Sequence, residues 1–198
     1  MTPQGTGMDG EFAPILEFWF GAAPVVYAER RKLWFGKDAA VDAEIRRRFS
    51  GAWQRAAAGD LARWESDAGG ALALTLLLDQ FPRNMFRDTP EAFASDALAR
   101  GVAGRALDRG LDRLLPPVQR LFFYLPFEHS ERLEDQERSV RLSSQFRGDP
   151  ELHDVYEYAV KHRDVIARFG RFPHRNAILG RESTPAEAAF LREPGSRF

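Results

Sequence analysis

Three stretches of this 198-residue chain place charged, imidazole and amide side chains among large aromatic residues. They cover residues 78–87, 122–131 and 168–176, and each contains a proline or glycine that interrupts a helical pattern. A polar group buried among apolar side chains lowers stability unless it finds a hydrogen-bonding or charged partner. The partners can be one another or a bound molecule, so we predict that the three stretches meet at one site. The residues alone do not identify its ligand or any reaction.

Asp79 lies in the first stretch, at a position that is unfavourable for its charge. It follows a strongly apolar helical segment, and the helix dipole disfavours a carboxylate at the C-terminal end of a helix. Arg83 and Arg87 come four and eight residues later and can supply the compensating charge. One interpretation is that Asp79 orients one of these guanidinium groups toward an anionic ligand. The other is a partly buried ion pair that clamps the turn between two helices.

The third stretch is rich in arginine. Pro173 can open a short helix, which would place free backbone N–H groups beside His174 and Arg175. Arginines near a helix N-terminus favour phosphate or carboxylate. The alternative is a lattice of arginines that neutralises acidic helix ends elsewhere in the chain. The predicted ligand-binding residues are Asp79, Arg83, Arg87, Arg168, Arg171, Arg175 and Asn176.

Four residues are candidates for proton transfer, with their catalytic role left open: His129, Glu131, His162 and His174. Imidazole exchanges its proton near neutral pH, and a nearby carboxylate can act with it as a general acid–base pair. Ser130 has no glycines of a nucleophile elbow around it, so we interpret it as a helix cap. The chain contains no His-Glu-x-x-His or Asp-x-Asp pattern, and we predict no metal and no cofactor.

The composition is that of an ordinary globular protein. Hydrophobic residues make up 44% of the chain and charged residues 29%, and the formal net charge is −1. This balance gives no global attraction to nucleic acid or to an anionic membrane surface, and we expect neither as a partner. The absence of cysteine excludes disulfides, thiolate metal sites and cysteine nucleophiles. Neither a signal-peptide pattern nor a bilayer-spanning apolar run is present, so we expect a cytoplasmic location.

Helices must position the polar stretches, because the hydrophobic pattern is helical almost throughout and no convincing strand pattern occurs. We predict one all-α domain of about eight to nine helices over residues 11–198, after a flexible arm at residues 1–10. The segment 71–81 is apolar on every side and is predicted to be the central buried helix, ended by Pro82. Apolar residues at helical intervals, tryptophans included, are assigned to the core.

Capping signals predict where other helices begin and end. Gly59, Gly110 and Gly170 are expected to end helices, since glycine readily adopts the left-handed conformation found there. Thr184 and Glu187 have the spacing of a capping box, which predicts a short last helix. Predicted helical ranges include 12–20, 38–58, 89–110 and 149–170.

The motifs at residues 78–84, 124–131 and 168–176 resemble those of DUF924, a bacterial family of unknown function. Further segments that resemble its pattern are 16–21, 34–37, 135–137, 179–181 and 190–191. The resemblance covers roughly residues 12–198 and implies a tetratricopeptide-like superhelical or bundle arrangement of helices. It implies no activity, cofactor or catalytic residue, and the usual tetratricopeptide signature positions are not legible in this chain.

Two hypotheses follow from these observations. In the first, the three stretches form a polar pocket for a small anionic molecule, with or without catalysis. In the second, the chain is a helical scaffold that binds a protein or peptide partner, and the same residues are a buried structural network. Oligomeric state is left open.

Overall fold

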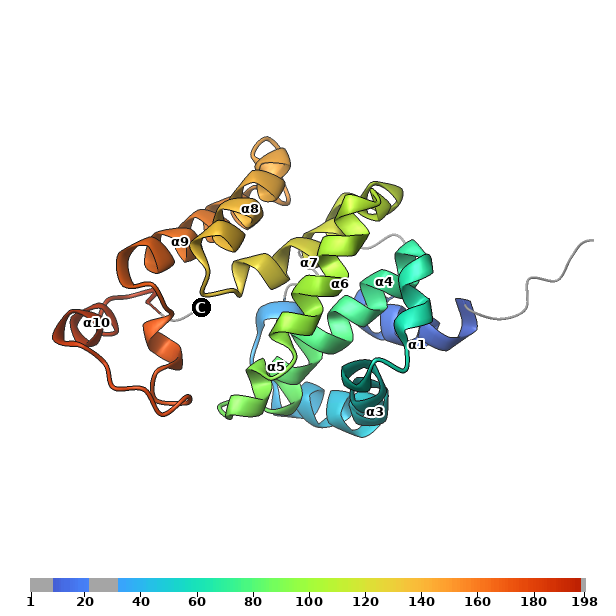
Figure 1. The fold of residues 1–198 in the computed structure, drawn as a ribbon, viewed down its shortest axis with the longest axis horizontal. Coiled ribbons are helices and arrows are strands. Elements are labelled where there is room, and N and C mark those ends of the chain that lie inside the picture. Colours follow the sequence, from blue (N-terminus) through green and yellow to red (C-terminus); the bar gives the residue numbers. More distant parts are fainter. Residues whose placement is uncertain (1–8, 22–31, 197–198) are drawn as a thin grey trace, which may run out of the picture.

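The computed structural model describes residues 9–21 and 32–196, and it confirms an all-α fold in a single domain. The described residues form nine α-helices (Figure 1). Their bounds are α1 Asp9–Phe20, α3 Ala39–Ala58, α4 Ala68–Thr75, α5 Phe81–Met85, α6 Asp96–Asp108, α7 Pro117–Glu128, α8 Leu133–Ser143, α9 His153–Phe169 and α10 Pro185–Phe190. No strand occurs in these ranges. The predicted arm lies mostly outside the described residues, and α1 begins at Asp9, earlier than predicted.

The helices pack in sequence against their neighbours. Helix α4 lies between α1 and α6, α7 follows α6, and α8 and α9 form a hairpin at the far side with α10 beyond it (Figure 1). Short 3₁₀ turns connect several of them: η1 Ala62–Ser66, η3 Pro90–Phe93, η4 Leu111–Leu114, η5 Ser144–Phe146 and η6 Pro173–Arg175. This order brings the end of α7 next to the C-terminal part of the chain.

Helix α3 shows how local signals set the ends of an element. The Asp38 carboxylate accepts a hydrogen bond of 2.8 Å from the backbone N–H of Ala40, which fixes the start. Gly59 ends the helix in the left-handed conformation, with φ +86°, as predicted. Between them Ile45 and Phe49 are buried on one face. Gly170 and the Thr184–Glu187 capping box also end α9 and start α10 as predicted.

The central helix departs from the prediction at Pro82, because proline does not end it. The backbone widens into a π-helical turn, η2 Leu76–Gln80, and continues as α5. Proline has no N–H, so the carbonyl of Leu78, four residues earlier, loses its helical donor. The Ser95 hydroxyl replaces that donor at 2.6 Å. The turn and this substitute bond let the chain pass through Pro82 and place Asp79 inside the molecule.

The apolar residues form two cores of unequal size. The main core joins α1 to α8 and contains stacked aromatic side chains, among them Phe81 with its ring centroid 5.3 Å from Trp19 and 5.0 Å from Phe49. The second core is formed by Val165, Ile166 and Phe172. We call residues 171–196 the C-terminal lobe. It packs on this small core and meets the main body at a polar junction.

Candidate functional site

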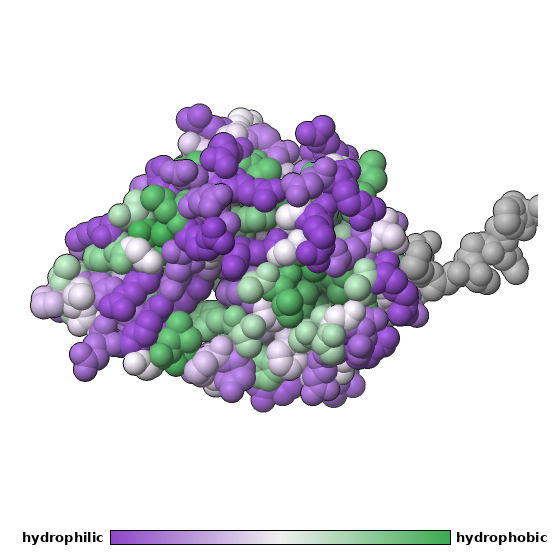
Figure 2. Space-filling view, in the orientation of Figure 1, coloured by the Kyte–Doolittle hydropathy of each residue, from purple (hydrophilic) through white to green (hydrophobic). Residues whose placement is uncertain are grey.

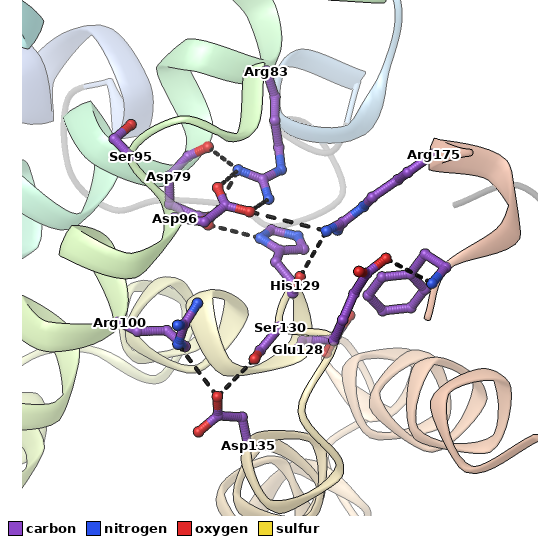
Figure 3. Close-up of polar contacts among 12 residues, drawn as sticks. Asp79, Arg83, Ser95, Asp96, Arg100, Glu128, His129, Ser130, Asp135 and Arg175 are labelled. Carbon is purple, nitrogen blue, oxygen red and sulfur yellow. Dashed lines mark hydrogen bonds and ion pairs between the residues drawn. The ribbon is translucent and has the colours of Figure 1, made fainter. Parts of the chain in front are cut away.

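Five polar residues from all three predicted stretches and from α6 meet where the C-terminal lobe joins the main body (Figure 3). We call them the junction cluster: Asp79, Arg83, Asp96, His129 and Arg175. Asp79 comes from the π turn, Arg83 from α5, Asp96 from the first turn of α6, His129 from the end of α7 and Arg175 from η6. The structure thus brings together parts of the chain that are far apart in the sequence.

Asp79 and His129 form the centre of the cluster. The Oδ1 atom of Asp79 lies 2.8 Å from Nδ1 of His129, and the Asp79 side chain is completely buried. Gln80 donates to Oδ2 at 2.5 Å, and Nη1 of Arg83 lies 3.3 Å from Oδ1. Burial alone would raise the pKa of Asp79, but Arg83, His129 and Gln80 together hold it well below its usual value. Asp79 is therefore an anion at neutral pH.

Arg83 is fully committed to other residues of the chain. Its Nη1 and Nη2 donate to the two oxygens of Asp96 at 2.9 and 3.0 Å, and Nη1 also donates to the Asp79 carbonyl at 2.5 Å. Asp96 stands in the first turn of α6, where the helix dipole favours a carboxylate. This bidentate pair links α5 to α6.

Arg175 is the most buried arginine of the cluster, with 7% of its surface exposed. Its Nη1 donates to the backbone carbonyl of His129 at 2.9 Å and lies 4.0 Å from the nearer oxygen of Asp96. The rings of Phe172 and Phe93 lie against the guanidinium, with centroids 4.4 and 4.7 Å away. Burial, with a contribution from Arg83, lowers the pKa of Arg175 to about 10, so the group stays charged at pH 7.

The Nε atom of Arg175 is buried and has no hydrogen-bond partner among the described residues. Its Nη2 donates to none of them either. In a guanidinium group, Nε–H and one Nη2–H point the same way and form an edge that fits a carboxylate. Arg175 therefore presents a charged, buried edge that the described part of the chain leaves unoccupied.

His129 is neutral at pH 7 and is held in one orientation. Burial, followed by the charge of Arg83, keeps its pKa below the usual value. Because Asp79 is deprotonated, Nδ1 of a neutral His129 must carry the proton and donate it to Asp79. The Nε2 atom is then a hydrogen-bond acceptor, and no described residue donates to it. The side chain keeps 15% of its surface exposed, so the ring is not sealed in.

A second buried pair lies next to the cluster. Oε1 of Glu128 is 3.2 Å from Nδ1 of His162, and both side chains are buried. Burial and the charge of Asp79 raise the pKa of Glu128 to about 8. Burial lowers the pKa of His162 to about 3. At neutral pH the pair is therefore a carboxylic acid beside a neutral imidazole.

Three further predicted residues hold the C-terminal lobe in place through internal partners. Glu131 accepts two hydrogen bonds from Arg181, at 2.7 and 2.9 Å, and one from the Phe172 N–H at 2.8 Å. Arg171 makes a bidentate pair with Glu187, at 2.6 and 2.8 Å. The Asn176 side chain bonds Ser183 and Arg181 and is buried. These contacts tie the lobe to the end of α7 and close it on itself.

Of the remaining predicted residues, Arg87 and Arg168 lie apart from the junction cluster, and His174 lies beside it in η6. Arg87 makes a bidentate pair with Asp42 of α3, beside a surface pocket of about 420 Å³. Arg168 is exposed on α9 and stacks on Phe169. His174 lies with its ring centroid 5.5 Å from that of Phe172. Arg87 and Arg168 therefore lie outside the junction cluster that contains Arg175.

The sequence reasoning missed Asp96 and Phe93. Their segment was expected to be the early part of one helix starting at Thr89–Pro90, but a 3₁₀ turn ends at Phe93 and α6 begins only at Asp96. The sequence feature that could have indicated Asp96 is its place directly after Ser95, as an acidic residue in the first turn of a helix. The hydrogen bond from Ser95 to Leu78 shows why that turn lies against the π turn.

The described ranges hold neither a metal-binding group nor a membrane-spanning helix. No group of three or more histidine, aspartate or glutamate residues in ranges 9–21 and 32–196 is arranged to hold a metal ion. Within the same ranges, every helix is too short or too polar to cross a bilayer.

Comparison with known proteins places the chain in a group without an established activity. A family described as "Bacterial protein of unknown function (DUF924)" matches residues 15–195. A solved structure of a protein of unknown function from Agrobacterium tumefaciens is 44% identical, with a TM-score of 0.82 over 91% of this chain and 96% of that one. A search of curated proteins finds no match.

Proposed function

The chain belongs to the DUF924 family of bacterial proteins of unknown function, and we propose that its junction cluster binds a small carboxylate anion. The proposal is drawn from the site itself, because neither the family description nor the solved structure gives an activity. Arg175 would hold the anion through its Nε–Nη2 edge. Asp79 and Arg83 would keep the surrounding charges in place. This proposal narrows the predicted pocket to a buried arginine whose carboxylate-binding edge has no partner in the described residues.

One observation carries the proposal, and it is the contrast between buried Arg175 and three more exposed arginines of the chain. In Arg87, Arg105 and Arg171 the Nε–Nη2 edge holds both oxygens of a carboxylate of this chain, Asp42, Glu65 and Glu187 respectively. Arg175 is more buried than these three, yet the same edge has no described partner. A buried donor without a partner costs about 1–3 kcal/mol, and more when it is charged. A ligand carboxylate would remove that cost.

The surroundings of Arg175 favour a planar, singly charged ligand group. Two phenylalanine rings lie against the guanidinium, so the edge is the part that remains available for recognition. Both carboxylate oxygens of Asp96 accept hydrogen bonds from Arg83. The contact between Asp96 and Arg175 is therefore only a distant one, at 4.0 Å. On the face shown in Figure 2, the surface is hollowed where the C-terminal lobe meets the region of α5 and α6. Solvent can therefore approach the lobe boundary.

Titration calorimetry and thermal denaturation with acetate, propionate and phosphate test this proposal on the full chain. We expect both carboxylates to bind and, at about 100 times the Kd, to stabilise the fold by about 2.7 kcal/mol. Arg175→Lys keeps the charge but loses the fork, and should weaken binding at least about tenfold. Arg105→Ala removes a surface arginine with the same bidentate geometry and should leave binding unchanged. Equal affinities in the wild type and Arg175→Lys would refute the proposal.

The alternative prediction, a peptide-binding scaffold with a tetratricopeptide-like surface, gives a different result in the same experiment. In that case Arg175→Lys lowers thermal stability, but no anion stabilises either protein. The cytoplasmic location predicted from the sequence fits both functions and stays a prediction.

A further inference from the structure

The position of His129 beside Arg175 indicates which chemical class of carboxylate ligand the site would bind. Nη1 of Arg175 donates to the His129 carbonyl at 2.9 Å, so the guanidinium and the imidazole belong to neighbouring parts of the same site. Asp79 holds Nδ1 of the ring at 2.8 Å. An anion on the Nε–Nη2 edge of the same guanidinium would share this junction with a histidine of fixed orientation.

The chemistry of Nε2 restricts what else the ligand can carry. Because Nδ1 donates its proton to Asp79, Nε2 presents a lone pair, and no described residue donates to it. A lone pair repels a second anionic oxygen and accepts a hydrogen bond from a hydroxyl group. The site thus combines a donor edge for a carboxylate with an acceptor for a neighbouring hydroxyl.

We propose that the ligand is a small hydroxy acid, whose carboxylate binds Arg175 and whose hydroxyl group donates to Nε2 of His129. This inference rests on the proposed function. Asp79 acts in it as a positioning residue, since it fixes the proton on Nδ1 and so keeps Nε2 an acceptor. Gln80 and Arg83 in turn hold Asp79.

Matched ligand pairs that differ by one hydroxyl group test the inference by calorimetry. The pairs are acetate with glycolate and propionate with 3-hydroxypropionate, which place the hydroxyl at two distances from the carboxylate. We expect at least one hydroxy acid to bind about tenfold tighter than its partner, the effect of one good hydrogen bond. His129→Phe should abolish this preference, so that the hydroxy acid and the plain acid of each pair bind the variant equally. His153→Phe, at an exposed histidine, is the matched control and should change neither.

Asp79→Asn gives a readout that a merely structural role would not produce. The side-chain amide introduced by this substitution can donate to Nδ1, which moves the ring proton to Nε2 and turns the acceptor into a donor. The variant should then prefer pyruvate, whose keto oxygen accepts, over lactate, whereas the wild type prefers lactate. If Asp79→Asn does not fold, the comparison of hydroxy and plain acids in wild type and His129→Phe still tests the inference.

The outcomes separate the two proposals. Equal binding of hydroxy and plain acids by the wild type would overturn the hydroxy-acid inference and leave carboxylate binding standing. An unchanged hydroxyl preference in His129→Phe would also overturn it. Absence of any binding would remove both.

Discussion

The main body and the C-terminal lobe are held together by different kinds of interaction. In the main body, α1 to α8 surround a continuous apolar core in which aromatic rings pack against one another. The lobe adds Phe172 to a small core that it shares with Val165 and Ile166 of α9, and it is fastened by charged hydrogen bonds, chiefly Glu131 with Arg181 and Arg171 with Glu187. Apolar packing is indifferent to pH and salt, whereas these pairs are sensitive to both.

The candidate site lies at the boundary between these two regions. Asp79 and Arg83 belong to the rigid main body, and Arg175 belongs to the lobe. A boundary of this kind can change its spacing without disturbing the main core. The proposed ligand binding should therefore depend on the docking of the lobe, because the cluster draws residues from both regions.

The largest expected effect comes from the main core. Phe81 is completely buried and contacts Trp19 and Phe49. Phe81→Ala removes these contacts and leaves a cavity, and should lower the free energy of unfolding by roughly 3–5 kcal/mol. Chemical denaturation followed by far-UV circular dichroism measures this loss. A loss below about 1 kcal/mol would show that the main body does not depend on this packing as the comparison requires.

Asp79→Ala tests the boundary itself. The change leaves His129 without its partner, and Arg83 keeps only Asp96 and the backbone carbonyl at position 79. Removing one partner of a buried charged network typically costs about 3 kcal/mol or more. We expect denaturation to show this loss, together with faster hydrogen exchange in η6 of the lobe. Exchange that is unchanged in the lobe would separate the site from lobe docking.

The pH dependence of stability sharpens the comparison through Glu128. Its pKa is raised from a usual 4.5 to about 8, so the folded chain binds a proton that the unfolded chain releases between these values. Stability from this group is present below pH 4.5 and is lost as the pH rises toward 8. Glu128→Gln carries no titrating proton and should be more stable than wild type at pH 8, by on the order of a few kcal/mol.

Thermal denaturation between pH 5 and pH 9 measures this difference. The two proteins should converge toward pH 5, because the cost of keeping a proton on Glu128 in the folded chain is small there and grows as the pH rises toward 8. His162 titrates in the same way in both proteins, so it cancels from the comparison. If the melting temperatures of wild type and variant changed with pH in parallel, the assignment of a neutral carboxylic acid at Glu128 would be contradicted.

The smallest expected effect is in the lobe. The Arg171 hydrogen bonds, with help from Thr184, lower the pKa of Glu187 to about 2, so this carboxylate is charged across the physiological range. Glu187→Gln weakens the pair with Arg171 and should speed hydrogen exchange in α10 a few-fold, with little change in the main transition. Hydrogen exchange in α10 of the wild-type protein should also be faster in about 1 M salt, since the Arg171–Glu187 pair is only partly buried and salt screens it. An equally large change in α4 would mean that the two regions unfold as one unit.

The fold was predictable from the sequence to the extent that local signals decide it. Helical periodicity indicated the all-α class, and the capping signals at Gly59, Gly170 and Thr184 set ends that the structure confirms. Pro82 was misread, because its effect on the helix depends on Ser95, a residue later in the chain that supplies the missing donor. A rule based on neighbouring residues cannot predict a hydrogen-bond partner that only the tertiary fold brings close.

The site was predictable only in part for the same reason. Arg83 lies beside Asp79 as expected, but the reason is the complete burial of the carboxylate and not a helix end, because the helix continues through Pro82. Charge alone could not tell Arg175 from Arg87 and Arg171, which are as basic in sequence but hold carboxylates of the chain. That distinction depends on which carboxylates the packed helices bring within reach. The open edge of Arg175 is therefore a property of the fold and not of the composition.

The π turn at Leu76–Gln80 has a consequence for changes of chain length. A π turn holds one residue more than a regular helical turn, so removing one residue here would restore the regular repeat and change which side chains of the turn face inward. Asp79 and Phe81 could then no longer face His129 and Trp19 together. We expect this segment to tolerate exchanges of one side chain for another far better than any insertion or deletion.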